Sequence, residues 1–265
     1  MHETAYAKLN LALQVRRRRG DGYHELETLF AFVDSGDELS AEPALVDALR
    51  VTGEFAPALD DPFANIAVKA LGLLPRAEGL AVLLEKNLPV AAGLGGGSAD
   101  AGAVFRLVGR RHGLPDDWSV RAARLGADVP ACVESVTCIG RGTGAELEPG
   151  PQDLAGTPLL LANPRVPLAT GPVFKAWDGI DRGPLPQGTA REMALAGRND
   201  LEAPAIALCP VIAEVLDALR QTGAWLVRMS GSGATCFALY KTAEARDAAR
   251  AALPPQWWTL AGALR

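Results

Sequence analysis

The sequence predicts an α+β protein of two sandwiched halves. Strand-like and helix-like segments alternate along its 265 residues, yet no βα unit repeats at a fixed period, which disfavours a doubly wound parallel sheet. Proline and glycine accumulate between residues 149 and 158, which predicts one domain at 1–155 and a second at 156–265. An apolar content of 49% with 22% charged residues suits a globular protein with a sizeable core.

The first predicted domain begins with a hairpin. Two strand-like segments, 5–15 and 25–33, flank the polar stretch 16–24, which we expect to form an exposed tip. A glycine-rich loop at 89–97 leads into an amphipathic helix, with Ser98 as its N-cap and Asp100 in its first turn. Asp128 falls at an expected helix-to-strand turn. The predicted strands are 5–15, 25–33, 80–85, 133–139 and 144–147, and the other predicted helices are 65–74 and 118–125.

The second predicted domain mixes strands and helices in the same way. A hairpin surrounds the segment SGSGA, where glycines favour a tight loop. Polar and proline-rich residues at 178–187 predict a loop. The predicted strands are 159–162, 225–229 and 235–241. The predicted helices are one beginning near 170, one at 210–222 and one at 243–253, and the last of them leads into residues 257–264.

Charge and hydropathy exclude several function classes. A formal charge of −5 gives no long-range attraction to nucleic acid, so a small polyanionic ligand needs locally placed cations. No apolar run approaches the roughly 18 residues of a membrane span, and the first residues do not resemble a secretory signal. We therefore expect a cytoplasmic protein with no nucleic acid or membrane partner. The four cysteines are too far apart for a metal or redox pair and are predicted to be reduced core residues: Cys132, Cys138, Cys209 and Cys236.

The glycine-rich loop is the clearest functional signal. Its glycines expose a row of backbone N–H groups just before a helix N-terminus, which attracts an anion such as phosphate. No Gly-Lys-Ser/Thr ending follows, so the loop is not a Walker P-loop, and Ser98 stands where a dinucleotide fingerprint needs glycine. A flexible loop that only caps the helix is the alternative.

Three segments together resemble the GHMP kinase superfamily. PVAAGLGGGSADAG at 89–102 is similar to its central phosphate loop, AKLNLAL at 7–13 to its N-terminal motif, and MSGSGATCFALY at 229–240 to its C-terminal glycine motif. The resemblance implies a ribosomal-protein-S5-like N-terminal domain, a ferredoxin-like C-terminal sandwich, and an enzyme that uses ATP and Mg²⁺ to phosphorylate a small alcohol.

Further segments narrow the resemblance to one subfamily. GDGYHELETLF at 20–30, LGADVPACV at 125–133 and GRGTGAEL at 140–147 resemble the kinases that phosphorylate a cytidylyl sugar alcohol in non-mevalonate isoprenoid synthesis. Homoserine and phosphomevalonate kinases are the enzyme alternatives, and an inactive nucleotide sensor is the non-enzyme alternative. The chain departs from the subfamily pattern at Tyr6, Ala99, Ala131, Cys132, Glu134 and Ser135.

The resemblance assigns roles to individual residues. Asp128 becomes the general base and Lys8 the partner that orients it and polarises the attacking oxygen. Asn10 becomes a substrate ligand, with a buried, satisfied amide as its alternative. Asp100 and Ser98 are candidate contacts to the metal, although Asp100 also suits the helix dipole. The residues expected around ATP are Pro89, Gly93, Leu94, Gly95, Gly96, Gly97, Ser98, Asn65 and Lys86, of which the resemblance places Asn65 and Lys86 around the adenine.

The remaining assignments concern the second substrate. Tyr23 and Phe174 are expected to stack on cytosine, and His24 to read its polar edge, with a packed turn and a core phenylalanine as alternatives. Thr170 and Pro172 should line the same pocket, and Gly231, Ser232 and Gly233 should let the chain approach the substrate closely. Residues 16–19, four arginines, are expected to be a solvated tip, or else a patch that steers polyanions. The resemblance leaves a weak homodimer open.

Overall fold

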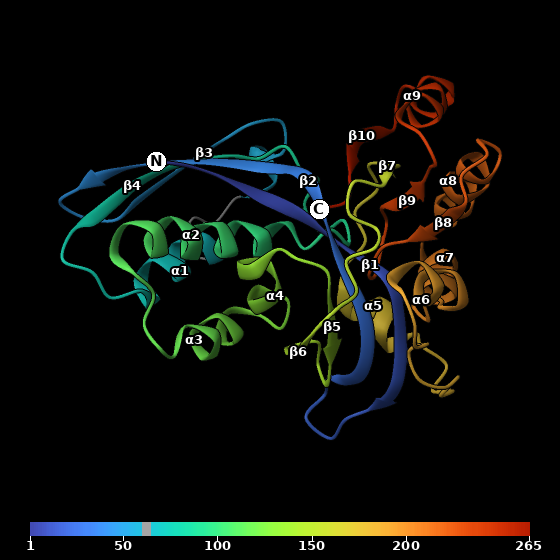
Figure 1. Ribbon diagram of the computed structural model, residues 1–265, viewed down its shortest axis with the longest axis horizontal. Coiled ribbons are helices and arrows are strands. Elements are labelled where there is room, and N and C mark those ends of the chain that lie inside the picture. The colour runs from blue at the N-terminus through green and yellow to red at the C-terminus, as the bar shows by residue number, and fades with distance from the viewer. Residues whose placement is uncertain (60–64) are drawn as a thin grey trace. The chain divides into compact units, whose positions relative to one another are not determined.

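The computed structural model describes residues 1–59 and 65–265, which form two compact units. The first contains Met1–Lys8, Ser35–Val90 and Gly95–Ser135, and the second contains Leu9–Asp34, Ala91–Leu94 and Val136–Arg265. Each unit combines helices with strands (Figure 1). This division does not coincide with the single boundary expected after residue 155. The long strands β1 (His2–Arg18) and β2 (His24–Ala44) contribute residues to both units, so no single cut can separate them.

The strands of the first unit are arranged around β4 (Gly79–Glu85). β4 pairs antiparallel with the C-terminal part of β2 and parallel with β3 (Ala48–Thr52). Alternate residues Leu80, Val82 and Leu84 are buried, which confirms the predicted strand. β3 was not predicted, because its five residues show no clear alternation.

Helices gather on one side of β3 and β4 in the first unit (Figure 1). The longest, α2, contacts the other three helices, and its face of Ala101, Val104, Phe105 and Val108 is buried as predicted. At Gly102 a β-carbon would lie 2.5 Å from the Cys132 carbonyl oxygen, so glycine is needed for the close contact. The elements are a 3₁₀ turn at Ala56–Ala58, α1 at Ile66–Leu73, α2 at Gly96–His112, α3 at Trp118–Leu125 and α4 at Val129–Glu134.

Helix α4 corrects one sequence prediction. Residues 133 and 134 were expected to begin a strand, but they complete α4, whose second residue, Pro130, fits the first turn of a helix. The departures from the subfamily pattern at Ala131, Cys132 and Ser135 are buried in or beside this helix. The Ser135 hydroxyl donates a 2.7 Å hydrogen bond to the Cys132 carbonyl oxygen, which closes the helix end.

The second unit is built on an antiparallel sheet with the order β10-β7-β9-β8, against which α8 and α9 pack (Figure 1). The strands are β7 (Pro158–Asn163), β8 (Leu226–Met229), β9 (Cys236–Leu239) and β10 (Trp258–Ala263), and the helices are α8 (Val211–Arg220) and α9 (Ala243–Ala252). All of these except β10 were predicted, because the sequence analysis assigned no element to residues 257–264. Residues 159–162 of β7 are completely buried, as their continuous apolar run indicates.

Shorter elements complete the second unit. β5 (Cys138–Arg141) pairs with residues 28–30 of β2 and with β6 (Glu146–Pro149). α5 (Thr170–Lys175) was predicted, whereas α6 (Ala190–Ala196) and α7 (Glu202–Leu208) were not. A reciprocal capping box between Thr189 and Glu192 starts α6 and was a readable signal. The four cysteines are buried thiols, as predicted. Among the described residues, no helix has the length and apolar character that crossing a membrane requires.

Candidate active site

The glycine-rich loop enters α2 earlier than the sequence suggests. Gly95, in the left-handed region with a φ of 62°, is the N-cap, so the prediction that Ser98 caps the helix is wrong. The Ala99 N–H donates to the Gly95 carbonyl at 2.8 Å, which makes Ser98 the third residue of the helix. The N–H groups of Gly96, Gly97 and Ser98 therefore occupy the first turn, where donors lack partners within the helix and suit an anion.

Lys8 and Asp128 meet beside this loop. The Lys8 Nζ lies 3.0 Å from an Asp128 carboxylate oxygen, and their side chains are 6% and 32% exposed. Asp128 directly precedes α4 but makes no capping hydrogen bond with its side chain. Its position lies between two helices, not at the expected helix-to-strand turn. A partly exposed carboxylate held by a buried ammonium is able to accept a proton from a bound hydroxyl.

Gly95 brings the loop onto this ion pair. A β-carbon at Gly95 would lie 3.0 Å from Lys8 Cε and 3.9 Å from an Asp128 carboxylate oxygen. The helix N-terminus and the ion pair thus form one continuous site within the first unit. The N-terminal strand, the central loop and the turn before α4 each supply one of these three residues.

Lys86 does not lie where the sequence analysis expects it. Its side chain is 2% exposed, and its Nζ contacts Asp37 and, at 2.8 Å, Asp100. A β-carbon at Gly96 would lie 3.3 Å from this Nζ, so the ammonium lies directly beneath the start of α2. A side chain buried in this way cannot contact adenine, and we correct that assignment. Lys86 supports the loop from inside the protein.

Asp100 belongs to the same buried cluster. It is the fifth residue of α2, outside the first turn where it was expected, and its second carboxylate oxygen is buried without a hydrogen-bond partner. Burial raises the pKa of Asp100 to about 8, with Asp37 adding to the shift and Lys86 opposing it. Burial by itself lowers the pKa of Lys86, but the two carboxylates outweigh it and the net shift is upward. The burial of Asp100 and its contact with Lys86 disfavour a role as a metal ligand.

Asn65 and the loop's apolar residues have structural partners. The Asn65 side chain caps α1 by accepting the Ala67 N–H at 2.9 Å. Pro89 and Leu94 are buried, so any contact to ATP would involve their backbone. At Gly97 a β-carbon would lie 3.0 Å from the Ile66 side chain of α1, so a larger residue there would require this side chain to shift.

In the second unit, Gly93 packs against the C-terminal glycine motif. The Ser230 hydroxyl donates to the Gly93 carbonyl at 2.9 Å, and a β-carbon at Gly93 would lie 2.3 Å from the Ser230 carbonyl oxygen. Asn10 lies nearby, because its N–H donates to the Ser230 hydroxyl at 3.3 Å. The Asn10 amide donates to the Thr28 hydroxyl at 2.8 Å and is 2% exposed, as in the buried-amide alternative.

The predicted base-recognition residues surround one cavity of about 520 Å³ in the second unit. Tyr23, which is 64% exposed, His24 and Phe174 all line it. The His24 and Phe174 rings are 5.0 Å apart at an angle of 41°. Burial, and to a smaller degree the charge of Arg18, lowers the pKa of His24 and favours its neutral form.

Several residues that line this cavity, or pack behind its wall, differ from the sequence expectation. Thr170 lines the cavity, and its hydroxyl lies 2.9 Å from that of Ser232, which links the C-terminal glycine motif to the wall. Pro172 is not among the lining residues, but Arg18 is. The four arginines of the hairpin tip are not simply solvated, because each contacts protein groups. Trp177, packed edge to face on His24, had no sequence signal.

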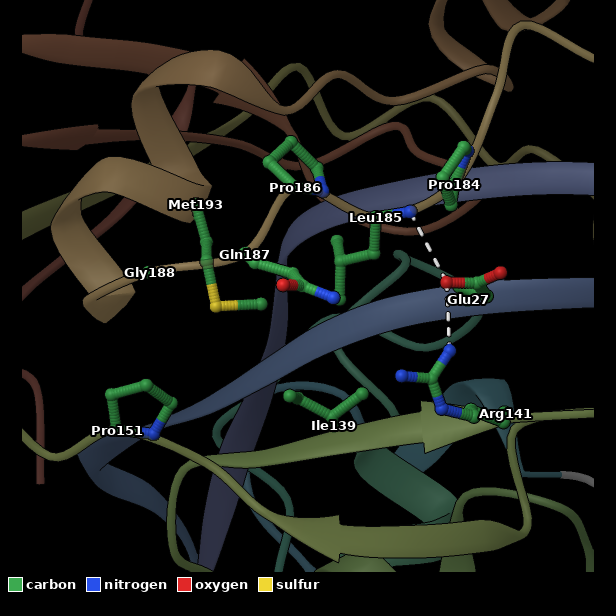
Figure 2. A pocket seen from close by; sticks show the side chains of 10 residues that line it. All are labelled: Glu27, Ile139, Arg141, Pro151, Pro184, Leu185, Pro186, Gln187, Gly188 and Met193. Carbon is green, nitrogen blue, oxygen red and sulfur yellow. Dashed lines mark hydrogen bonds and ion pairs between the residues drawn. The ribbon is translucent and has the colours of Figure 1, made fainter.

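A second cavity of about 540 Å³ lies elsewhere in the second unit (Figure 2). Figure 2 shows Arg141 bound to Glu27 on one wall, with Gln187 and Met193 on another. Arg141 also contacts Glu148 at 3.1 Å. Two carboxylates thus neutralise this guanidinium, which leaves the cavity no excess positive charge for a phosphate. None of the predicted site residues lines it.

Comparison with known proteins first defines the class. The family models described as "GHMP kinases N terminal domain" and "GHMP kinases C terminal" match residues 63–136 and 186–259. The fold and the phosphate loop are accordingly those of a GHMP kinase. A homoserine kinase from Cytophaga hutchinsonii shares this fold with a TM-score of 0.70 at 18% identity, over 100% of this chain and 94% of that one.

More similar relatives define the family within that class. A 4-diphosphocytidyl-2-C-methyl-D-erythritol kinase from Novosphingobium aromaticivorans is 77% identical over 100% of this chain and 93% of its own length. One from Erythrobacter litoralis is 62% identical over 99% of each chain. A crystal structure of 4-(cytidine 5'-diphospho)-2C-methyl-D-erythritol kinase matches with a TM-score of 0.84 and 35% identity, covering 100% and 99% of the two chains. The chain belongs to the 4-diphosphocytidyl-2-C-methyl-D-erythritol kinase family.

Proposed function

We propose that this protein transfers the γ-phosphoryl group of ATP to the 2-hydroxyl of 4-diphosphocytidyl-2-C-methyl-D-erythritol. The observation that carries the proposal is the Lys8–Asp128 ion pair, 3.0 Å long, beneath the Gly95 start of α2. A phosphate bound at the helix N-terminus would lie next to a carboxylate that can accept the hydroxyl proton. Family membership supports the choice of alcohol.

The proposed phosphoryl transfer forms one bond and breaks one. The substrate oxygen forms a bond to the γ-phosphorus, the bond from that phosphorus to the bridging oxygen breaks, and ADP leaves. The hydroxyl proton passes to Asp128. Lys8, 6% exposed, holds the carboxylate in place and contributes a positive charge near the oxygens on which negative charge develops.

The loop supplies the contacts to ATP. Backbone N–H groups of Gly96, Gly97 and Ser98 suit its phosphates, and the absence of side chains at the glycines leaves room for them. Mg²⁺ would neutralise phosphate charge during transfer and would be held mainly by the phosphates. The Ser98 hydroxyl, half-buried on the first turn of α2, fits a contact to the ion or to its water, whereas the buried Asp100 does not.

The cavity in the second unit suits the cytidylyl group. Tyr23 and Phe174 offer ring faces for stacking, and His24, which burial keeps neutral, forms part of the same wall. A cytoplasmic location and a weak homodimer remain parts of the proposal, and sedimentation at several protein concentrations tests the dimer.

A panel assay tests the function. ADP release is measured with Mg²⁺-ATP and, in turn, the cytidylyl alcohol, mevalonate phosphate and homoserine. We expect turnover with the cytidylyl alcohol alone, and loss of turnover on chelation of Mg²⁺. Turnover with homoserine alone would reassign the subfamily, and ATP binding without turnover of any alcohol would support a nucleotide sensor.

A further inference from the structure

Arg17 and Arg18, neighbours in the arginine run at the hairpin tip, make different contacts. Arg17 contacts only one charged partner that the structure records, Glu25, and 71% of its side chain is exposed. Arg18 instead reaches across to the end of α5. Its Nη2 donates to the carbonyl oxygens of Lys175, at 3.4 Å, and Trp177. Arg18 therefore joins the hairpin to the segment that carries Phe174.

Arg18 also contacts the ring of Trp177. The guanidinium carbon lies 5.6 Å from the centre of the indole ring, within the range of a cation–π interaction. The same side chain thus binds both the backbone and the ring of Trp177. Trp177 is 2% exposed, so its ring is fixed by packing as well.

Trp177 in turn supports His24. The two rings are 5.8 Å apart and meet edge to face at 81°. Phe174 packs on His24 at 5.0 Å, so the imidazole is held between two aromatic rings. His24 Nε2 and Trp177 Nε1 are both buried without a hydrogen-bond partner, so packing rather than hydrogen bonding orients the imidazole.

We propose that Arg18 and Trp177 are positioning residues that fix the orientation of His24 for recognition of the substrate base. Arg18 fixes Trp177, Trp177 fixes the His24 ring, and the ring held in this way forms part of the cavity wall. The inference rests on the proposed function, because it assumes that this cavity receives the cytosine. It also accounts for Arg18 without the steering patch that the sequence analysis considered.

Three arginine substitutions separate a positioning role from an effect of charge. Arg18→Gln and Arg17→Gln remove the same charge from neighbouring positions, and Arg18→Lys keeps the charge but loses the planar fork. We expect Arg18→Gln to raise the KM for the cytidylyl alcohol about tenfold, as for the loss of hydrogen bonds from a charged group, with the ATP KM unchanged. Arg17→Gln should leave both KM values unchanged. Arg18→Lys should recover only a small part of the loss.

The tryptophan is tested in the same assay. Trp177→Phe keeps an aromatic edge against His24, whereas Trp177→Leu does not, and thermal unfolding shows whether each variant is folded. We expect Trp177→Leu, but not Trp177→Phe, to reduce the preference for the cytidylyl over the uridylyl alcohol.

The outcomes distinguish this inference from the proposed function. If the wild-type protein does not turn over the cytidylyl alcohol, the function itself is wrong. If it does, and Arg18→Lys restores the wild-type KM in full, Arg18 acts as a charge on the substrate and the positioning role is overturned. Equal effects of Arg17→Gln and Arg18→Gln would overturn it in favour of steering. If Arg18→Gln or a folded Trp177→Leu leaves the KM for the cytidylyl alcohol and the base preference unchanged, Arg18 and Trp177 do not position His24.

Discussion

The backbone of Gly95 lies directly on the side chain of Lys8. A β-carbon at Gly95 would be 3.3 Å from Lys8 Cβ as well as 3.0 Å from Cε, and its φ of 62° is unfavourable for other residues. Gly95→Ala should therefore strain the start of α2 and displace Lys8 from Asp128. We expect kcat to fall at least tenfold, measured by ADP release, since small misplacements at a reacting centre are costly.

A matched glycine provides the control. Gly72, in α1, has no neighbouring atom within 4 Å of a built β-carbon and is exposed. Gly72→Ala should leave kcat unchanged and raise stability by about 0.5 to 1 kcal/mol, because alanine favours a helix. If Gly95→Ala were as active as Gly72→Ala, the loop would not control Lys8.

The Lys8–Asp128 ion pair predicts that substitutions at the two residues lower kcat non-additively. Asp128→Asn keeps the shape of the side chain but cannot accept the proton, and it should lower kcat by about 10² to 10⁴ with little change in ATP affinity. Lys8→Ala should have a similar effect, because the ammonium lies 3.0 Å from that carboxylate. The double variant should be scarcely worse than either single variant. Multiplicative losses would mean that the two residues serve separate steps.

Hydrophobic periodicity was sufficient to predict the strands and helices in which the apolar pattern repeats several times. β4 alternates cleanly, and α8 buries Ile212, Val215, Leu216 and Leu219 at helical spacing. In contrast, α4, α6 and α7 contain six or seven residues, less than two full turns, so their apolar pattern is too short to distinguish a helix from a strand or loop.

The sequence predicted the candidate site residues only where they belong to a family motif. Lys8 and Asp128 are 120 positions apart, and no local pattern indicates that they meet. The N-cap preference for serine favoured Ser98, but close packing on Lys8 requires glycine at position 95. Lys86 was assigned to adenine from the family resemblance. Its partner Asp37 is 49 residues away in the sequence, so no local pattern indicated that Lys86 is buried.

If Tyr23 and Phe174 stack on the base, their loss should raise the KM for the cytidylyl alcohol and leave the KM for ATP unchanged. Tyr23 is 64% exposed, so Tyr23→Ala should cost little stability but remove one ring face from the cavity. Loss of stacking is worth about 1 to 3 kcal/mol per base, which corresponds to roughly a ten- to hundredfold rise in the KM for the cytidylyl alcohol. Phe174→Ala should have at least this effect, because Phe174 also packs on His24.

Steady-state kinetics with each substrate varied in turn measures both effects. Tyr23→Phe retains the ring and serves as the conservative control, with a KM near that of the wild type. The ATP KM should stay constant throughout. A rise in the ATP KM with no change for the alcohol would mean that the two sites are assigned the wrong way round.

The buried Asp100 predicts a dependence of stability on pH. Its pKa is raised by burial from 3.8 to about 8, so between these values the folded protein retains a proton that the unfolded chain has released. The stability that this group contributes is complete below about pH 4, falls by up to about 1.4 kcal/mol per pH unit as pH rises, and is lost above about pH 8. Asparagine has nearly the same shape and does not titrate.

Urea unfolding of the wild type and of Asp100→Asn between pH 5 and pH 9 tests this expectation. The variant should gain stability relative to the wild type as pH rises, and the difference should level off above about pH 8. Asp117→Asn is the control, because hydrogen bonding to Arg121 lowers the pKa of this exposed carboxyl and confines its effect to pH values below this range. A difference between Asp100→Asn and the wild type that stays constant over the whole range would show that Asp100 is ionised throughout, with Lys86 shared by two charged carboxylates.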